Sequence, residues 1–311
     1  MISEQQLNNW AQAPSPTEME KIKRTREIIE NKIRTHLPIA EIKKKYGLDS
    51  FVFPEIYLQG SYANSTNIRF DSDVDIVVQF NDVFWSDKRQ LSEVEKNIHS
   101  LSYSNSSYHF IEFKNDIFLA LQKAFGANAV YSDKCLKVKE NTYRVNSDVV
   151  PCFQYRVYKK FISYNNQDYV EGMKFINTGN NSEIINFPKL HLKNCESKNI
   201  DTDGNFKSLV RVFKNIKRDL VDSGELNEKT APSYFVENLL YNCSSPCFDG
   251  SFQDCVVKIL QFIFDAMETG RISGFVCANE QNSLISNQTW NSVDLNTFIA
   301  KFGYYFLKSK K

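Results

Sequence analysis

The chain lacks several features that would narrow its function at once. None of its apolar runs reaches the roughly 18 residues that a transmembrane helix needs. Its first residues do not show the basic and then apolar pattern of a secretory signal. With a net charge of +1 it has no strong basic excess, so a nucleic-acid activator is not indicated. These absences predict a cytoplasmic protein that works away from the membrane.

Cysteine is present, but not in a pattern typical of a disulfide framework. The 7 cysteines are odd in number and scattered, and in a cytoplasmic protein we expect them to be reduced and mostly buried. One grouping offers four residues of the types that bind zinc: His191, Cys195, Cys243 and Cys247. Their spacing is looser than that of common structural zinc sites, which favours a grouping that arose by chance. From the sequence alone, zinc binding at these four residues stays open.

The length and patterning of the chain indicate two lobes. With 311 residues, 42% of them hydrophobic, the chain can form a sizeable core. Residues typical of strands dominate the first half, and helical periodicity dominates from Asn205 onward. We predict an α+β fold with a mixed or antiparallel sheet, a C-terminal helical lobe and an active site in the cleft. The predicted domains are residues 1–190, a core that includes a long N-terminal bracing helix, and residues 191–311.

The apolar periodicity also predicts individual elements. In the first half we expect helices over residues 87–100 and 111–125, a hairpin of residues 130–138 with 141–150, and further strands over 153–176. In the second half we expect helices over residues 205–223, 234–240, 252–267 and 294–307.

The most informative stretch begins at Gly60-Ser61 and ends at Asp73-x-Asp75, which enters a β-branched run. On a strand, Asp73 and Asp75 share a face about 7 Å apart, at roughly 3.3 Å rise per residue. Carboxylates that close repel, and one stays protonated unless a cation neutralises the pair. Mg²⁺ binds carboxylate and phosphate oxygens together. The Gly-Ser turn offers backbone N–H groups and a hydroxyl to a phosphate.

This arrangement resembles the signature of the polymerase-β-like nucleotidyltransferases. The resemblance implies a third carboxylate on a neighbouring strand. The β-rich run over residues 143–153 contains one acid, Asp148, in an Asp-Val-Val-Pro context.

The helical half contains a second group of candidate residues. Lys207, Arg211 and Lys214 are spaced to lie on one helix face, which suits a triphosphate, although ordinary surface charge has the same pattern. Ser233 stands at the start of a helix, where backbone N–H groups bind phosphate. Tyr234 is placed to stack on a base. The alternatives are a helix cap for Ser233 and a core position for Tyr234.

Together these residues resemble the bacterial CD-NTases, the cGAS/DncV-like nucleotidyltransferases of CBASS anti-phage systems, and clade E most closely. The resemblance spans roughly residues 55–240 and rests on six motifs. They are Gly60-Ser61, Asp73-x-Asp75, Asp148-Val-Val-Pro, Phe187-Pro188-Lys189-Leu190-His191, the helix over residues 206–217, and Ser233-Tyr234-Phe235-Val236-Glu237.

The resemblance implies an enzyme that joins two NTPs into a cyclic dinucleotide and releases pyrophosphate. Its catalytic and metal-binding residues would be Asp73, Asp75 and Asp148, with two Mg²⁺ ions, or Mn²⁺ as an alternative. Of the three, Asp148 is the residue expected to act most like a general base.

The nucleotide-binding residues that the resemblance implies are Gly60, Ser61, Lys214, Ser233, Tyr234, Arg211 and Asn186. Asn186 is a candidate reader of a base edge, and a turn role is an equal alternative. The expected partners are NTPs and a separate effector that reads the product, with the enzyme a monomer.

Two other functions remain open. The enzyme could transfer a nucleotide to RNA, a protein or a small molecule, although near-neutral charge argues against long RNA. It could also be an inactive nucleotide-binding regulator, although the presence of all three carboxylates argues against that. The sequence does not tell which bases are joined, whether the links are 3′–5′ or 2′–5′, or what activates the enzyme.

Overall fold

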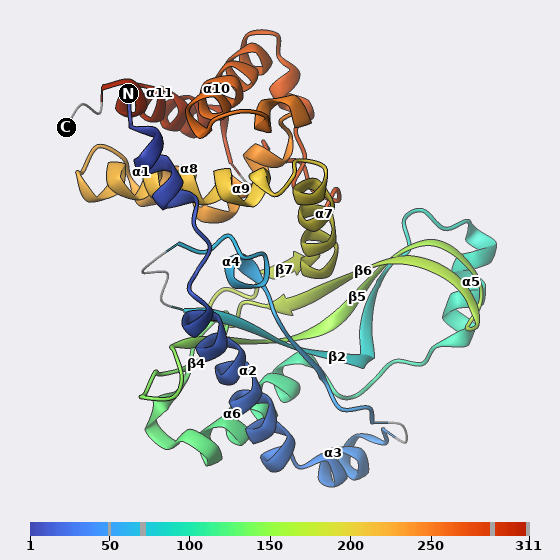
Figure 1. Cartoon of the computed structure of the whole chain (residues 1–311). Helices are drawn as coiled ribbons and strands as arrows, with labels where there is room; N and C mark the ends of the chain where they lie inside the picture. Colours follow the sequence, from blue (N-terminus) through green and yellow to red (C-terminus); the bar gives the residue numbers. More distant parts are fainter. Residues whose placement is uncertain (49–50, 69–72, 287–289, 309–311) are drawn as a thin grey trace. The chain divides into compact units, whose positions relative to one another are not determined.

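The computed structural model describes residues 1–48, 51–68, 73–286 and 290–308. The chain forms two compact units (Figure 1). The sheet unit comprises residues 16–59 and 72–189, and the helical unit comprises residues 1–15, 60–71 and 190–311. The expected division into residues 1–190 and 191–311 stays a prediction. The compact units differ from it, because residues 1–15 and 60–68 pack with the second half of the chain.

The described part of the sheet unit contains a seven-stranded mixed sheet. Its central path runs in the order β1-β2-β5-β4-β3, and β6 pairs with both β5 and β7. Strands β2 and β5 are parallel, and the other pairs are antiparallel. The strands are β1 (Glu55–Leu58), β2 (Val74–Asp87), β3 (Ala129–Tyr131), β4 (Leu136–Val138), β5 (Ser147–Ser163), β6 (Asn166–Ile176) and β7 (Glu183–Asn186).

The parallel pair forms the centre of this unit. Strand β2 is buried without alternation over residues 76–80, as is usual for a parallel strand covered on both faces. Phe80 in β2 and Phe153 in β5 are register partners and contact the ring of Phe113 from helix α6. The β-branched and aromatic residues of the two runs therefore supply both the strand propensity and the core.

The residues described in the sheet unit form four α-helices: α2 (Pro16–His36), α3 (Ile39–Tyr46), α5 (Glu93–Ser102) and α6 (Phe110–Phe125). Helix α2 packs along α6, and α6 covers β3, β4 and β5 (Figure 1). Thr25 of α2 accepts a hydrogen bond from the backbone N–H of Val145 (3.1 Å), just before β5.

Two local predictions in this unit were wrong. The helix expected from Asp87 begins at Glu93, because β2 continues through a bulge between Phe80 and Phe84 and a capping box at Ser92 starts α5. The segment 130–138 is not one strand, since β3 and β4 form their own hairpin, and β4 then pairs with the start of β5. The helix at 111–125 and the strands over 153–176 are confirmed as α6, β5 and β6.

The helical unit is built around α8 (Asn205–Asp222), whose apolar residues recur at spacings of three and four. Around α8 lie α1 (Glu4–Ala11), α9 (Ser233–Tyr241), α10 (Phe252–Glu268) and α11 (Ser292–Lys308) (Figure 1). The ring of Phe213 stacks on Phe302 of α11 at 4.3 Å between centroids. Helices α4 (Gly60–Ala63) and α7 (Pro188–Ile200) complete the described set, and the four helices expected in this half are confirmed.

The described helices include none with both the length and the apolar character that crossing a membrane requires.

Candidate active site

Asp75 and Asp148 are register partners across the parallel strands β2 and β5. Side chains at paired positions point to the same face of a sheet, and Asp73, two residues before Asp75, precedes the same strand. Burial raises the pKa of the Asp75 carboxyl, and the charges of Asp148 and Asp73 raise it further, to about 7. The three predicted carboxylates thus crowd at the beginning of two neighbouring strands.

This crowding fits a divalent cation. A carboxyl whose pKa is raised by burial and by like charges carries its charge at a cost, and a nearby cation removes that cost. The donors are all carboxylate oxygens, the ligands that Mg²⁺ prefers. The residues present therefore suit the metal that the sequence motif implies.

Lys137 faces the same group and was not among the predicted site residues. It is the register partner of Asp148 on β4, and its Nζ lies 3.6 Å from Asp148 Oδ1. Both residues line a cavity of about 350 Å³, whose walls are Asp73, Val130, Lys137, Val138, Lys139, Asn146, Ser147 and Asp148. Nothing in the local sequence marks Lys137, because its position depends on how β4 pairs with β5.

Gly60 and Ser61 begin the short helix α4 in the helical unit. Gly60 has a φ of 71°, a conformation that glycine adopts without strain. The Ser61 carbonyl accepts from the backbone N–H of Thr66 (2.9 Å), and the Gly60 carbonyl accepts from that of Asn64 (3.1 Å). The turn after Gly-Ser is thus closed on itself. Residues 69–72, between this turn and Asp73, lie outside the described residues.

The three basic residues singled out on α8 are buried, so the alternative that they are ordinary surface charge was wrong. Lys207, Arg211 and Lys214 are 7%, 6% and 2% exposed. Arg211 donates to the carbonyls of Ala11 (2.8 Å) and Ser65 (2.5 Å), and burial lowers its pKa to about 10. Lys207 pairs with Glu196.

Lys214 lies against the segment that follows Gly-Ser. Its Nζ donates to the carbonyl of Thr66 (3.0 Å) and to Thr66 Oγ1 (3.2 Å). The helical spacing indicated that these basic residues share a face, but it did not indicate that segments distant in sequence bury that face. A nucleotide-binding role for Arg211 and Lys214 stays a prediction.

Ser233 is the first residue of α9, as expected. The N-cap residue is Pro232, and no side chain makes a capping hydrogen bond, so Ser233 does not cap the helix. Tyr234 is 40% exposed and is therefore not a core residue. Its ring stacks on that of His191, with centroids 5.0 Å apart and planes 28° apart.

Asn186 ends strand β7 in the sheet unit, where it is exposed and pairs with Met173. This pairing accounts for the backbone position of Asn186 and gives no evidence that its side chain contacts a base. The role of Asn186 in base recognition therefore also stays a prediction.

The four candidate zinc ligands named from the sequence, His191, Cys195, Cys243 and Cys247, do not form one group in the described residues. In the described residues, His191 and Cys195 instead cluster with Glu237, and the ligand atoms of these three lie within 4.8 Å of one another. Cys243 and Cys247 are buried separately from this cluster.

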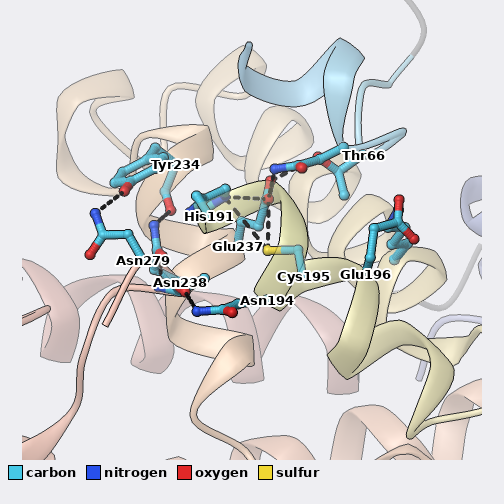
Figure 2. A network of polar contacts seen from close by, with 12 residues as sticks. Thr66, His191, Asn194, Cys195, Glu196, Tyr234, Glu237, Asn238 and Asn279 are labelled. Atoms are coloured by element: carbon cyan, nitrogen blue, oxygen red, sulfur yellow. Dashed lines mark hydrogen bonds and ion pairs between the residues drawn. The ribbon is translucent and has the colours of Figure 1, made fainter. Parts of the chain in front are cut away.

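Glu237 is the centre of a polar network that the sequence did not reveal (Figure 2). Its carboxylate accepts from Asn64 Nδ2 (2.5 Å) and Thr66 Oγ1 (2.8 Å) and lies 2.9 Å from His191 Nε2. Burial by itself would raise the pKa of Glu237, but the hydrogen bond from His191 and the charge of Lys214 outweigh it and lower the pKa to about 2. A lone carboxylate in the apolar run after Tyr234 was the available signal.

Comparison with known proteins identifies the family. Residues 193–306 match the model of the cGAS/DncV-like nucleotidyltransferase C-terminal helical domain, and residues 42–165 match that of the nucleotidyltransferase domain. The cyclic nucleotide synthase CdnE01 of Staphylococcus haemolyticus is 36% identical over 98% of this chain and 98% of its own length. The chain belongs to the cGAS/DncV-like nucleotidyltransferases. It is therefore an enzyme of the predicted class.

Solved structures support the same assignment. The Rhodothermus marinus CdnE c-UMP-AMP synthase with Apcpp and Upnpp has a TM-score of 0.82 at 33% identity, covering 100% of this chain and 98% of its own. The Elizabethkingia meningoseptica CdnE cyclic dinucleotide synthase with GTP and Apcpp has a TM-score of 0.73 at 30% identity, covering 98% and 99%. The predicted α+β nucleotidyltransferase fold and the likeness to clade E are confirmed.

Proposed function

We propose that this enzyme joins two NTPs into a cyclic dinucleotide and releases pyrophosphate, using divalent metal ions held by Asp73, Asp75 and Asp148. The synthesis of cyclic nucleotides is the activity that its curated relatives share by name. The observation that carries the metal assignment is the pairing of Asp75 with Asp148 across β2 and β5, with the pKa of Asp75 raised to about 7.

The residues of this chain have separate tasks in the proposed reaction. The hydroxyl of one nucleotide attacks the α-phosphorus of the other, the bond to pyrophosphate breaks, and the hydroxyl proton leaves towards Asp148. The same step, repeated on the linear intermediate, closes the ring and releases a second pyrophosphate. Ser61 and the backbone at Gly60 hold donor phosphate, together with Ser233, Lys214 and Arg211. Tyr234 stacks on the base and Asn186 contacts a base edge. When bound, Mg²⁺ or Mn²⁺ would activate the hydroxyl and neutralise the charge that develops on the phosphates.

The bases joined by this enzyme do not follow from its relatives. A cyclic UMP-AMP synthase of Rhodothermus marinus is 38% identical over 79% of this chain. A cyclic dipurine nucleotide synthase of Elizabethkingia meningoseptica is 35% identical over 86%, and a cyclic dipyrimidine nucleotide synthase of Cecembia lonarensis is 35% identical over 77%. Relatives at similar identity thus differ in product, so the product has to be measured.

We further propose that the product is a second messenger in CBASS anti-phage defence, read by a separate effector. On this proposal the enzyme works as a monomer in the cytoplasm, where NTPs are available, and needs no nucleic-acid activator.

The test is to incubate the purified enzyme with each NTP, and with all four, in the presence of Mg²⁺. We expect pyrophosphate release and a phosphatase-resistant product whose mass is the sum of two nucleoside monophosphates minus two water molecules, as a cyclic dinucleotide requires. The double variant Asp73→Ala with Asp75→Ala should fold and make none. A linear or acceptor-linked product would favour transfer to another molecule, and the absence of any turnover would favour an inactive regulator.

A further inference from the structure

Glu237 connects two parts of the helical unit to which the proposed function gives different tasks (Figure 2). On one side its carboxylate holds Asn64 and Thr66, which follow Gly60-Ser61. On the other side it holds His191, the ring on which Tyr234 stacks. The same buried side chain therefore contacts the segment proposed to hold phosphate and the support of the residue proposed to hold the base.

The contacts on the phosphate side bind the segment closely. The backbone N–H of Thr66 donates to the carbonyl of Ser61, and the backbone N–H of Asn64 donates to that of Gly60. The side chains of these same two residues donate to Glu237, and Lys214 donates to the carbonyl of Thr66. A shift of the Glu237 carboxylate would therefore be passed to the Gly-Ser turn through two residues.

The contacts on the base side involve a stacked pair of rings. His191 is buried, and its Nε2 lies 2.9 Å from Glu237 Oε1. Because Tyr234 stacks on this ring, the orientation of His191 sets the plane on which Tyr234 rests. Asn279 donates to the Tyr234 hydroxyl (3.4 Å), which fixes the other end of the tyrosine.

A metal site is the competing interpretation of this cluster, since His191, Cys195 and Glu237 offer three ligand types. The surroundings argue against it. The ammonium of Lys214 lies 3.7 Å from Glu237 Oε2, and the two carboxylate oxygens already accept from Asn64, Thr66 and His191. Burial also raises the pKa of the Cys195 thiol, which opposes the thiolate that a metal needs. A second cation would compete with Lys214 for the same charge.

We propose that Glu237 is a positioning residue that sets the Gly60–Thr66 segment and the His191–Tyr234 stack relative to each other, so that the phosphates and the base of one NTP are held together. This inference rests on the proposed function. The lowered pKa of Glu237, about 2, keeps the carboxylate charged throughout the working pH range. Truncation would remove the volume of the side chain as well as the counter-charge of the buried Lys214, so Glu237→Gln is the preferred change because it removes the charge and keeps the shape.

The experiment uses two probes and four variants of the full chain. Magnesium tripolyphosphate has no base, so its equilibrium binding reports the phosphate side alone. The KM for the NTPs that the wild type consumes reports both sides. The variants are Glu237→Gln, Thr66→Val, His191→Ala and, as a matched control, Glu196→Gln. Glu196 is a half-exposed carboxylate on the same helix as His191, paired with Lys207.

We expect Glu237→Gln to weaken tripolyphosphate binding about tenfold and to raise KM by a larger factor, as the loss of hydrogen bonds to a buried charged group predicts. Thr66→Val should weaken tripolyphosphate binding and raise KM, both by a similar factor. His191→Ala should raise KM while changing tripolyphosphate binding less than about twofold. Glu196→Gln should change neither.

The inference is overturned if folded Glu237→Gln binds tripolyphosphate and NTPs as the wild type does, or if the purified wild type contains one zinc ion per chain. Should Glu237→Gln fail to fold, the tripolyphosphate binding of Thr66→Val and His191→Ala still decides the question. Weaker binding by the first with nearly unchanged binding by the second supports the inference, and equal binding by the two contradicts it. If the wild type makes no cyclic product, the proposed function fails, and tripolyphosphate binding by the variants still tests the phosphate side of the network.

Discussion

Asp75 lies where its charged carboxylate is unfavourable. Its carboxyl is partly buried beside Asp148 and Asp73, and burial together with these two charges raises its pKa to about 7. A group with a raised carboxyl pKa binds its proton more tightly in the folded state than in the unfolded state. The metal-free protein should therefore lose stability as the pH rises from about 4 to about 7, and the full loss should be present above that range.

The variant Asp75→Asn removes this cost. Without metal, in the presence of a chelator, it should melt about 2–4 °C or more above the wild type at pH 8, the shift that about 1 kcal/mol gives in a protein of this size. At pH 4.5 the two proteins should melt at similar temperatures, because Asp75 is then protonated in the folded wild type. Melting curves at the two pH values test this, and an equal difference at both would contradict the role of charge.

The sequence could place Asp73 and Asp75 on one face because strand alternation is a short-range rule. Asp148 was expected on a neighbouring strand only because the resemblance to the nucleotidyltransferases implies a third carboxylate there, and β5 is that strand. Glu237 was missed because its partners are far away in the sequence, and Lys137 was missed because its position depends on the register of β4 with β5. Glu237 contacts residues 171 and 173 positions earlier, and no local pattern encodes such a contact.

At the level of elements, helix α5 is joined to β5 by a buried histidine. His99 contacts the rings of Tyr103, Tyr158 and Phe161. Burial lowers the pKa of His99, and the charges of Lys88 and Arg156 lower it further, to about 4. Because its folded pKa is below its usual value of 6.5, the unfolded state binds the proton more readily in that range.

Stability should therefore fall as the pH drops from about 6.5 towards 4, because the unfolded chain gains a proton in this range while the folded His99 stays neutral. The variant His99→Phe cannot be protonated and keeps a ring in the aromatic cluster. Its free energy of unfolding should decrease less than that of the wild type between pH 7 and pH 5, when both are measured by urea denaturation. Parallel pH profiles of the two proteins would rule out His99 as a source of acid sensitivity.

Elements with strong periodicity were predictable, and elements set by pairing were not. Helix α8 follows its apolar spacing from Phe206 to Leu220. Strand β2 runs past Phe80 because a bulge lets it continue along β5, and the helical-looking pattern near Asp87 gave no sign of that pairing. The hairpin of β3 and β4 was misjudged for the same reason, since register is a property of two strands.

At the scale of the whole chain, the helical unit gathers segments that are distant in sequence. The N-terminal helix α1 packs on α8, where Leu7 and Ala11 are fully or nearly fully buried. The backbone N–H of Ile2 donates to the carbonyl of Phe306 (2.9 Å), and Arg211 of α8 donates to that of Ala11. The first residues are thus part of the core that supports α8.

The variant Leu7→Ala tests this support. It should lower the free energy of unfolding by about 2–5 kcal/mol, as the removal of a fully buried leucine side chain does. The measurement is urea denaturation, with the exposed Leu101→Ala as the matched control, which should change stability little. An unchanged midpoint for Leu7→Ala would mean that α1 does not contribute to the core.

The sequence motifs lie in both units, so the family could be inferred from them before the arrangement of the segments was known. Gly60 and Ser61 belong to the helical unit, whereas Asp73, Asp75 and Asp148 belong to the sheet unit. This distribution could not be predicted, because it arises from residues 60–68 packing with helices that come much later in the chain.

Mass spectrometry of the products made from the four NTPs and Mg²⁺ tests the central claim most directly, when wild type and Asp75→Asn are compared. We predict a cyclic dinucleotide from the wild type and none from Asp75→Asn, which should be folded and more stable without metal. A cyclic dinucleotide formed equally by both proteins would contradict the assignment of the carboxylates on β2 and β5 as the catalytic metal site.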